Sequence, residues 1–503
     1  MATARDKGQE ARDELSRPTA HDILPYRVRY ACGQRGCAPA GANRRRRFFS
    51  TYPQAIGSYM PLALTSSALR DVALAAIEHA KRGGADQAEA EATQGSGLNV
   101  TVRLGELETL EHNVDKSLGV TVYVNGCKGN ASTGDFSTEA VTAAVDKALT
   151  IARYTSPDPC AGLADAELMA REIPELDLYH PWDIDAAAAT KIAKLCEDAG
   201  FAVDARVDNS EGASVSMSES EFMYANTHGF NAGYKGSAHY IGCAMLASDG
   251  DAMERDDWYT SDRVASKLED AASVGRKAGE RALARLNPRK VTTQSAPVIL
   301  TPSLAAGFIG HGIAALYGGS QYRKTTFLLD AIDKEIFSKN INIVDDPHIK
   351  QAYASSPFDG EGVACTKRMI VENGVIRGYF LSAYSARKLG LKSTGNAGGN
   401  HNLLVRSTTQ GDYLTLAKQI GKGLIVTELM GQGVNPVTGD YSRGAAGFWV
   451  ENGEIAYPVS EITIAGNLLD LYKRITAIGS DVDHRGSKWI GSLLVESMQI
   501  AGA

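Results

Sequence analysis

Hydrophobic and polar residues repeat with two different spacings, one after the other, in the first half of the folded chain. Apolar residues recur every three to four positions over residues 66–82, which is typical of one face of a helix. Strict alternation of apolar and polar residues follows in three stretches, residues 88–93, 98–104 and 118–124. The pattern predicts a helix and then three strands, the third ending at an Asn-Gly hairpin turn.

Later segments extend this unit with further helices and strands. Helical spacing over residues 137–153 and 185–199 predicts two helices, and alternation near residues 213–224 predicts a strand. Residues 264–286 are predicted to form a long helix that ends before an Asn-Pro pair and connects to the next domain. The order of elements predicts an α+β unit with its helices on a mainly antiparallel sheet.

The second half of the chain consists mainly of predicted strands. Asn373-Gly374 and Asn452-Gly453 each follow a short apolar run and predict two-residue hairpins, and residues 424–427 predict another buried strand. Hairpins of this kind require antiparallel pairing. We therefore expect a β-rich C-terminal unit, a curled sheet or partial barrel, that carries one central helix.

The predicted central helix follows an apolar strand at residues 297–300. Ser303 stands at the position expected for its N-cap, and apolar residues continue at helical spacing as far as Leu316. Gly318-Gly319 are predicted to end it, because glycine reaches positive φ at little cost. His311 lies within this helix.

Length predicts more than one domain, since 503 residues exceed the usual size of a single core. We expect an N-terminal α+β domain over residues 60–290 and a C-terminal β-rich domain over residues 291–503. Residues 1–59 lack either period and contain the run Arg44–Arg47. They resemble either an organellar transit peptide or a mis-assigned extension upstream of a true start at Met60, and their acidic residues favour the second. Disorder is expected under both interpretations.

Composition narrows the class of partner and the compartment. The formal net charge of -7 opposes nonspecific binding to nucleic acid. No apolar run is long enough to suggest a membrane span. The seven cysteines are scattered and odd in number, which is typical of a reducing compartment, so we expect the protein to lie in the cytoplasm. From the charge and the apolar runs we expect neither a nucleic-acid nor a membrane partner.

Several motifs in the C-terminal half together resemble one family of metalloproteases. The central helix, a Gly-Gly-Ser, the run Tyr322-Arg323-Lys324 and the stretch GQGVNPVTGD, which contains Asn435, are similar to the TldD/PmbA family, and specifically to its PmbA (TldE) branch. In the TldD branch, the helix carries His-Glu-x-x-x-His, which supplies two zinc ligands and the carboxylate that activates water. A cysteine near the C-terminus supplies the third ligand.

This sequence departs from the zinc motif of the TldD branch. His311 matches the first histidine, but Gly312 and Leu316 stand in place of the glutamate and the second histidine, and no cysteine follows Cys365. A zinc hydrolase needs about three protein ligands and a general base. The resemblance therefore implies a chain without catalytic residues or a metal of its own.

The resemblance also implies a partner that completes the enzyme. A TldD-like paralogous chain would supply zinc and the general base, in a heterodimer or higher assembly that degrades peptides and unfolded proteins. This chain would shape the cavity and hold the partner. The residues expected to line the cleft or contact the partner are His311, Tyr322, Arg323, Lys324 and Asn435.

Two other functions stay open from the sequence alone. One is a non-enzymatic regulator of a DNA-processing enzyme, of the gyrase-modulator type, because the family carries such a description. The other is a self-sufficient hydrolase that uses Cys365 as its nucleophile. The glycine-rich loop at residues 388–400 lacks the Gly-Lys-Ser/Thr spacing of a phosphate cradle and is expected to line the cleft.

Overall fold

The structure, a computed structural model, describes residues 62–502. The predicted extension 1–59 and the predicted start at Met60 lie outside the described residues. Among residues 62–502, no helix combines the length and the apolar character that crossing a bilayer requires.

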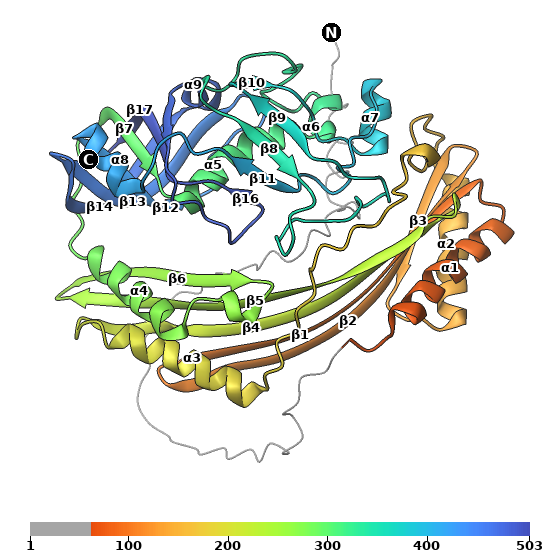
Figure 1. Ribbon diagram of the computed structural model, residues 1–503, viewed down its shortest axis with the longest axis horizontal. Helices are drawn as coiled ribbons and strands as arrows, with labels where there is room; N and C mark the ends of the chain where they lie inside the picture. The colour runs from red at the N-terminus through yellow and green to blue at the C-terminus, as the bar shows by residue number, and fades with distance from the viewer. Residues whose placement is uncertain (1–61, 503) are drawn as a thin grey trace, which may run out of the picture. The chain divides into compact units, whose positions relative to one another are not determined.

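The N-terminal half contains a long six-stranded antiparallel sheet in the order β3-β2-β1-β4-β5-β6 (Figure 1). Its strands are β1 (Gln87–Arg103), β2 (Glu106–Val124), β3 (Cys127–Thr133), β4 (Val207–Asn226), β5 (Asn231–Asp249) and β6 (Ala252–Asp262). The Asn125-Gly126 turn joins β2 to β3 with φ values of 51° and 76°, which confirms the predicted hairpin.

The prediction of two separate strands at residues 88–93 and 98–104 is wrong, because β1 runs through both. Polar Gln94 and Ser96 interrupt the apolar pattern between them, yet both are buried within the strand. The Gln94 amide donates to Glu221 Oε2 at 2.8 Å and to the Leu64 carbonyl at 2.8 Å. A buried polar side chain with such partners can continue a strand without breaking it.

Four helices cover one face of this sheet, as the α+β prediction requires. They are α1 (Ser66–Arg82), α2 (Thr138–Tyr154), α3 (Ala186–Phe201) and α4 (Ala271–Ala284). The even-numbered residues of β1 all point to one face of the sheet, because side chains alternate along a strand. Those near its start (Ala88, Ala90, Ala92) pack with α1 and α2, and those near its end (Leu98, Val100, Val102) pack with α3 and α4. All four helices therefore lie on that face. The predicted long helix 264–286 begins only at Ala271, because Asp270 caps it by accepting from the backbone N–H of Ser273.

The C-terminal half contains a barrel-like ring of strands. One sheet has the order β14-β13-β12-β7-β17-β15, and β14 also pairs with β17, so five of its strands close on themselves. The strands are β7 (Gln294–Leu300), β12 (Gly423–Met430), β13 (Asp440–Glu451), β14 (Glu454–Asn467), β15 (Ile475–Ile478) and β17 (Leu493–Ala501). This closure confirms the predicted curled sheet or partial barrel, although β7 and β12 pair in parallel.

A second sheet in this half has the order β10-β9-β8-β11-β16 (Figure 1). Its short strands are β8 (Ile343–Asp346), β9 (Arg368–Glu372), β10 (Val375–Ile376), β11 (Asn402–Val405) and β16 (Lys488–Trp489). The predicted hairpins at Asn373-Gly374 and Asn452-Gly453 both form, with positive φ at all four residues.

Helix α5 (Pro302–Ala315) is the predicted central helix, and its buried side chains share one core with strands of both C-terminal sheets. Further short helices are α6 (Gly318–Tyr322), α7 (Ala383–Leu389), α8 (Tyr413–Ile420) and α9 (Leu468–Lys473).

The two predicted ends of α5 are wrong. The N-cap is Thr301 rather than Ser303, because Pro302 occupies the first helical position, where its missing N–H is not needed. The helix ends at Ala315 with Leu316 as its C-cap, and the two glycines begin α6 instead of stopping α5. Gly318 is required for packing, since a Cβ there would lie 2.4 Å from Ser385 Oγ.

Candidate functional site

His311 lies on α5 in a cationic environment. Its ring is half-buried and contacts Tyr441 of β13 edge-on, with ring centroids 6.1 Å apart. The side chain of Lys488 of β16 lies against the same turn of the helix: a Cβ at Gly310 would be 3.2 Å from Lys488 Cε. Burial, and then the positive charges of Arg443 and Lys488, lower the pKa of His311. The imidazole is therefore neutral near pH 7, and its neighbours oppose a further positive charge.

The helix position after His311 is closed by an aromatic side chain. Gly312 is buried, and a Cβ there would lie 3.1 Å from the ring and hydroxyl of Tyr472. Tyr472 is fully buried, stacks on Phe337 with centroids 4.5 Å apart, and donates its hydroxyl to the Phe308 carbonyl at 2.9 Å. The ring is held from several sides, so it fills the space that a longer side chain at position 312 would need.

Leu316, which stands where the second histidine of the zinc motif would be, belongs to the hydrophobic core. It is fully buried among the apolar residues that α5 shares with both C-terminal sheets. Its isobutyl group offers no ligand atom. Within residues 62–502, no group of three or more His, Cys, Asp or Glu side chains is placed to hold a metal ion. The donor set around His311 therefore does not fit a zinc ion.

Tyr322 is the last residue of the short α6, and Arg323 and Lys324 follow it, so the three residues do not lie at the end of α5. Arg323 Nη1 donates to the Tyr322 hydroxyl at 2.9 Å, and its guanidinium lies 5.1 Å from the centre of that ring. Tyr322 in turn contacts Tyr384 of α7, with centroids 5.8 Å apart. Arg323 and Lys324 are exposed, so their side chains can reach a carboxylate of another molecule.

Asn435 is exposed and has a structural function within its loop. Its Oδ1 accepts from the backbone N–H of Val437 at 2.9 Å, which forms an Asx turn. The loop also meets the segment after Lys324, because the Phe327 N–H donates to the Pro436 carbonyl at 2.9 Å. Val434 pairs with Tyr441, the ring that contacts His311. The loop of Asn435 thus approaches both His311 and the Tyr322–Lys324 segment, which were predicted together.

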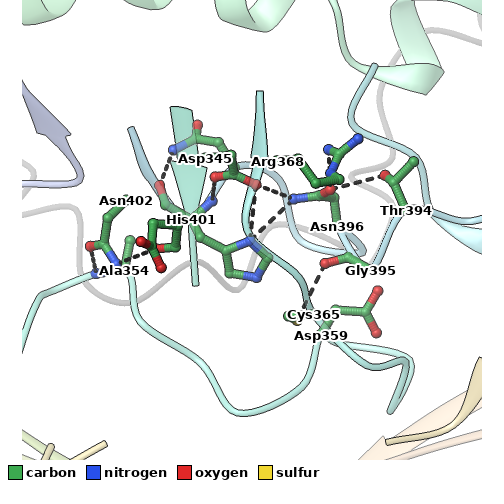
Figure 2. A network of polar contacts seen from close by, with 12 residues as sticks. Asp345, Ala354, Asp359, Cys365, Arg368, Thr394, Gly395, Asn396, His401 and Asn402 are labelled. Atoms are coloured by element: carbon green, nitrogen blue, oxygen red, sulfur yellow. Dashed lines mark hydrogen bonds and ion pairs between the residues drawn. The ribbon is translucent and has the colours of Figure 1, made fainter. Parts of the chain in front are cut away.

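A buried polar network lies on the five-stranded sheet and was not predicted (Figure 2). Asp345 of β8 is fully buried, accepts from the His401 N–H at 2.7 Å and lies 3.2 Å from His401 Nδ1. Asn396 donates to Asp345 at 3.0 Å and accepts from Arg368 of β9 at 2.7 Å. These contacts fasten the glycine-rich loop to β8 and β9. The partners are as many as 56 residues apart, and no local pattern in the sequence connects them.

Cys365 lies at the edge of this network and does not have the features of a nucleophile. It is buried, and its Sγ donates to the Gly395 carbonyl at 3.4 Å (Figure 2). Burial, and then the charges of Asp359 and Asp345, raise its pKa. A catalytic thiol needs a lowered pKa and access to substrate. The surroundings therefore oppose the interpretation of Cys365 as the centre of a hydrolase.

Two neighbouring carboxyl groups, Asp359 and Glu361, have raised pKa values. Burial raises the pKa of Asp359 to about 6, although three backbone N–H groups donate to it. Burial, together with the charge of Asp359, raises the pKa of Glu361 to about 8. Glu361 accepts from the Ala383 N–H at 2.8 Å at the start of α7. Glu89 of β1 adds a further negative charge nearby. Glu361 therefore carries a proton at neutral pH.

Comparison with known proteins places this architecture in one family. Residues 88–152, 179–286 and 293–502 match, in turn, the descriptions "PmbA/TldA metallopeptidase domain 1", "central domain" and "C-terminal domain". The "Metalloprotease PmbA homolog" of Haemophilus influenzae is 47% identical over 434 residues, which cover 86% of this chain and 96% of that protein. The chain belongs to the PmbA/TldD metallopeptidase family.

Two solved structures share the fold. One is described as a modulator of DNA gyrase from Bacteroides thetaiotaomicron. It has a TM-score of 0.82 and 26% sequence identity, and the match covers 86% of this chain and 99% of the Bacteroides chain. The other is TldE from Thermococcus kodakarensis. It has a TM-score of 0.73 and 20% sequence identity, and the match covers 86% of this chain and 100% of the Thermococcus chain. At that identity the second likeness concerns the fold alone.

Proposed function

We propose that this chain is the PmbA (TldE)-type subunit of a TldD/TldE-type zinc metallopeptidase, and that a TldD-like paralogous chain supplies the zinc and the general base. One observation carries the proposal: the ring of Tyr472 closes the position of Gly312, and Leu316 is part of the core. A catalytic zinc ion needs about three protein ligands, and the water bound to it needs a general base to become a nucleophile. Helix α5 offers one histidine.

The six-stranded sheet supports a second part of the proposal, namely that this chain forms a wall of the chamber that holds peptides or unfolded proteins. Ser214, Ser216, Ser218 and Ser220 alternate along β4 with Val215 and Met217, which pack into the helix-covered core. The serines therefore point to the opposite face. Short hydroxyl side chains can exchange hydrogen bonds with a main chain without selecting its sequence. Such a wall suits substrates of varied sequence.

The proposal is tested by mixing the two chains. This chain alone should not cleave an unstructured peptide, whereas adding a TldD-like partner should produce cleavage that a chelator stops. Replacing the glutamate of the partner's motif should abolish activity, because the zinc-bound water then loses its base. His311→Ala in this chain should change the rate only modestly, since no metal depends on it. The proposal is wrong if this chain alone cleaves peptides and His311→Ala eliminates that cleavage.

A regulator of a DNA-processing enzyme is the second candidate function. It is favoured by the description of the Bacteroides structure as a modulator of DNA gyrase. The net charge of -7 opposes direct contact with DNA, so such a regulator would act by binding protein. A pull-down that recovers a topoisomerase and no TldD-like chain would support this candidate over the peptidase subunit.

A further inference from the structure

The outer face of the five-stranded sheet carries an apolar row that crosses four strands. Met369 of β9 pairs with Val344 of β8, Val344 with Leu404 of β11, and Leu404 with Trp489 of β16. Paired residues of neighbouring strands point to the same face. The row therefore places one large apolar side chain on each strand and extends over about 14 Å, three strand spacings. The next residues along the central strands, Asp345 and Leu403, face the buried side.

This apolar row forms the floor of a hollow of about 450 Å³, which is within the range of pockets that hold small ligands. Met369 is 42% exposed, so its side chain is available in the open hollow. At one end, His484 contacts Trp489 edge-on with ring centroids 4.6 Å apart, so the two rings form a wall. The hollow can thus accept one or two apolar side chains.

A polar row borders the apolar row on the same face. Asn342 and Arg406 are two residues from Val344 and Leu404, about 7 Å along their strands, and both line the hollow. The Arg406 N–H donates to the Asn342 carbonyl at 3.1 Å, so the two residues are cross-strand neighbours. Within residues 62–502, the exposed Arg406 guanidinium forms no ion pair, and none of the described lining residues is acidic.

We propose that this hollow binds the C-terminal residue of a peptide, with an apolar side chain on the row Met369–Trp489 and the free carboxylate on Arg406. A guanidinium fork matches a carboxylate with two parallel hydrogen bonds. Asn342 Oδ1 already accepts from the Asn373 N–H at 3.0 Å, so the NH₂ group of the same side chain is the part that can donate a hydrogen bond to a ligand. A peptide carbonyl can accept from that group, whereas the chain of a fatty acid cannot. The inference goes beyond the proposed function and does not depend on the partner chain.

Calorimetric titration of the full chain tests the proposal with three probes: N-acetyl-Ala-Ala-Phe with a free C-terminus, the same peptide as its C-terminal amide, and decanoate. We expect the free acid to bind at least about tenfold more tightly than the amide, because hydrogen bonds from a guanidinium to a charged carboxylate are stronger than those to a neutral amide. Arg406→Gln should weaken binding of the free acid by a similar factor and leave binding of the amide unchanged.

Arg276→Gln is the matched control, since Arg276 is exposed on α4 and lies outside the hollow. It should bind all three probes as the unmodified chain does. Met369→Ala should weaken both peptides equally, because it removes part of the apolar floor. Equal affinity for acid and amide, an unchanged affinity in Arg406→Gln, or no binding of the free acid would each overturn the proposal. Binding of decanoate in preference to the peptide acid would also overturn it and would indicate a lipid ligand.

Discussion

Gly312→Glu restores the carboxylate of the zinc motif and should severely destabilise this chain. A Cβ at position 312 would lie 3.1–3.2 Å from three atoms of Tyr472, and Phe337 and Phe308 hold that ring with centroids 4.5 Å and 5.3 Å away. Because the ring cannot move aside, the new side chain overpacks the core.

The size of the effect follows from three contributions. Replacing glycine within a helix is favourable by about 0.5–1 kcal/mol. Overpacking costs about 1–3 kcal/mol, and a buried carboxylate without a partner costs roughly 3–5 kcal/mol. The net loss is therefore about 3–7 kcal/mol, which is comparable with the whole stability of an ordinary domain, roughly 5–15 kcal/mol.

The matched control is Gly307→Glu on the same helix. Gly307 is exposed, and a Cβ there would meet no atom within 4 Å. This variant should be unchanged or stabilised by up to about 1 kcal/mol from helix propensity alone. Urea unfolding followed by far-UV circular dichroism should give a much lower midpoint for Gly312→Glu than for Gly307→Glu. Equal midpoints for the two variants would refute the conclusion that Tyr472 closes this position.

Three further predictions concern Glu361, Cys365 and Leu316. Since the pKa of Glu361 is raised from 4.5 to about 8, the folded chain retains a proton that the unfolded chain loses, and stability should fall as pH rises from about 5 to 8. Glu361→Gln should lessen this fall in melting temperature between pH 5 and pH 9, whereas Glu280→Gln on the exposed face of α4 should not. At pH 7.5, an alkylating reagent should label Cys365 more slowly than the half-buried Cys127, and rapid selective labelling of Cys365 would revive its interpretation as a nucleophile. Leu316→His should lower stability by roughly 2–5 kcal/mol and recruit no zinc, and a variant that instead gains a bound zinc would show that the site is not closed.

The sequence predicted those elements whose signal is local. Helical spacing identified α5, and each Asn-Gly pair at a strand end formed its hairpin, because φ > 0 at both turn residues is a property of two neighbours. The continuity of β1 was missed because the partners of Gln94 lie at Leu64 and Glu221, far away in the chain. Closure of the ring depends on the pairing of β14 with β17, which no local period indicates.

The candidate site divides in the same way. The absence of the zinc motif could be seen at Gly312 and Leu316, but the reason a glutamate cannot be restored at position 312 is Tyr472, 160 residues further along the chain. The network of Asp345 and His401 was invisible, because its members come from separate strands and loops that meet only after folding. The loop of Asn435 was predicted to be functional, whereas the side chain of Asn435 forms an Asx turn.

The zinc content of the purified full chain is the most direct test of the claim that this chain does not hold the catalytic metal. The chain should be dialysed against trace zinc and then analysed for metal and protein in the same sample. The account predicts much less than one zinc per chain, and no change in that content for His311→Ala. About one zinc per chain, lost in His311→Ala, would contradict it.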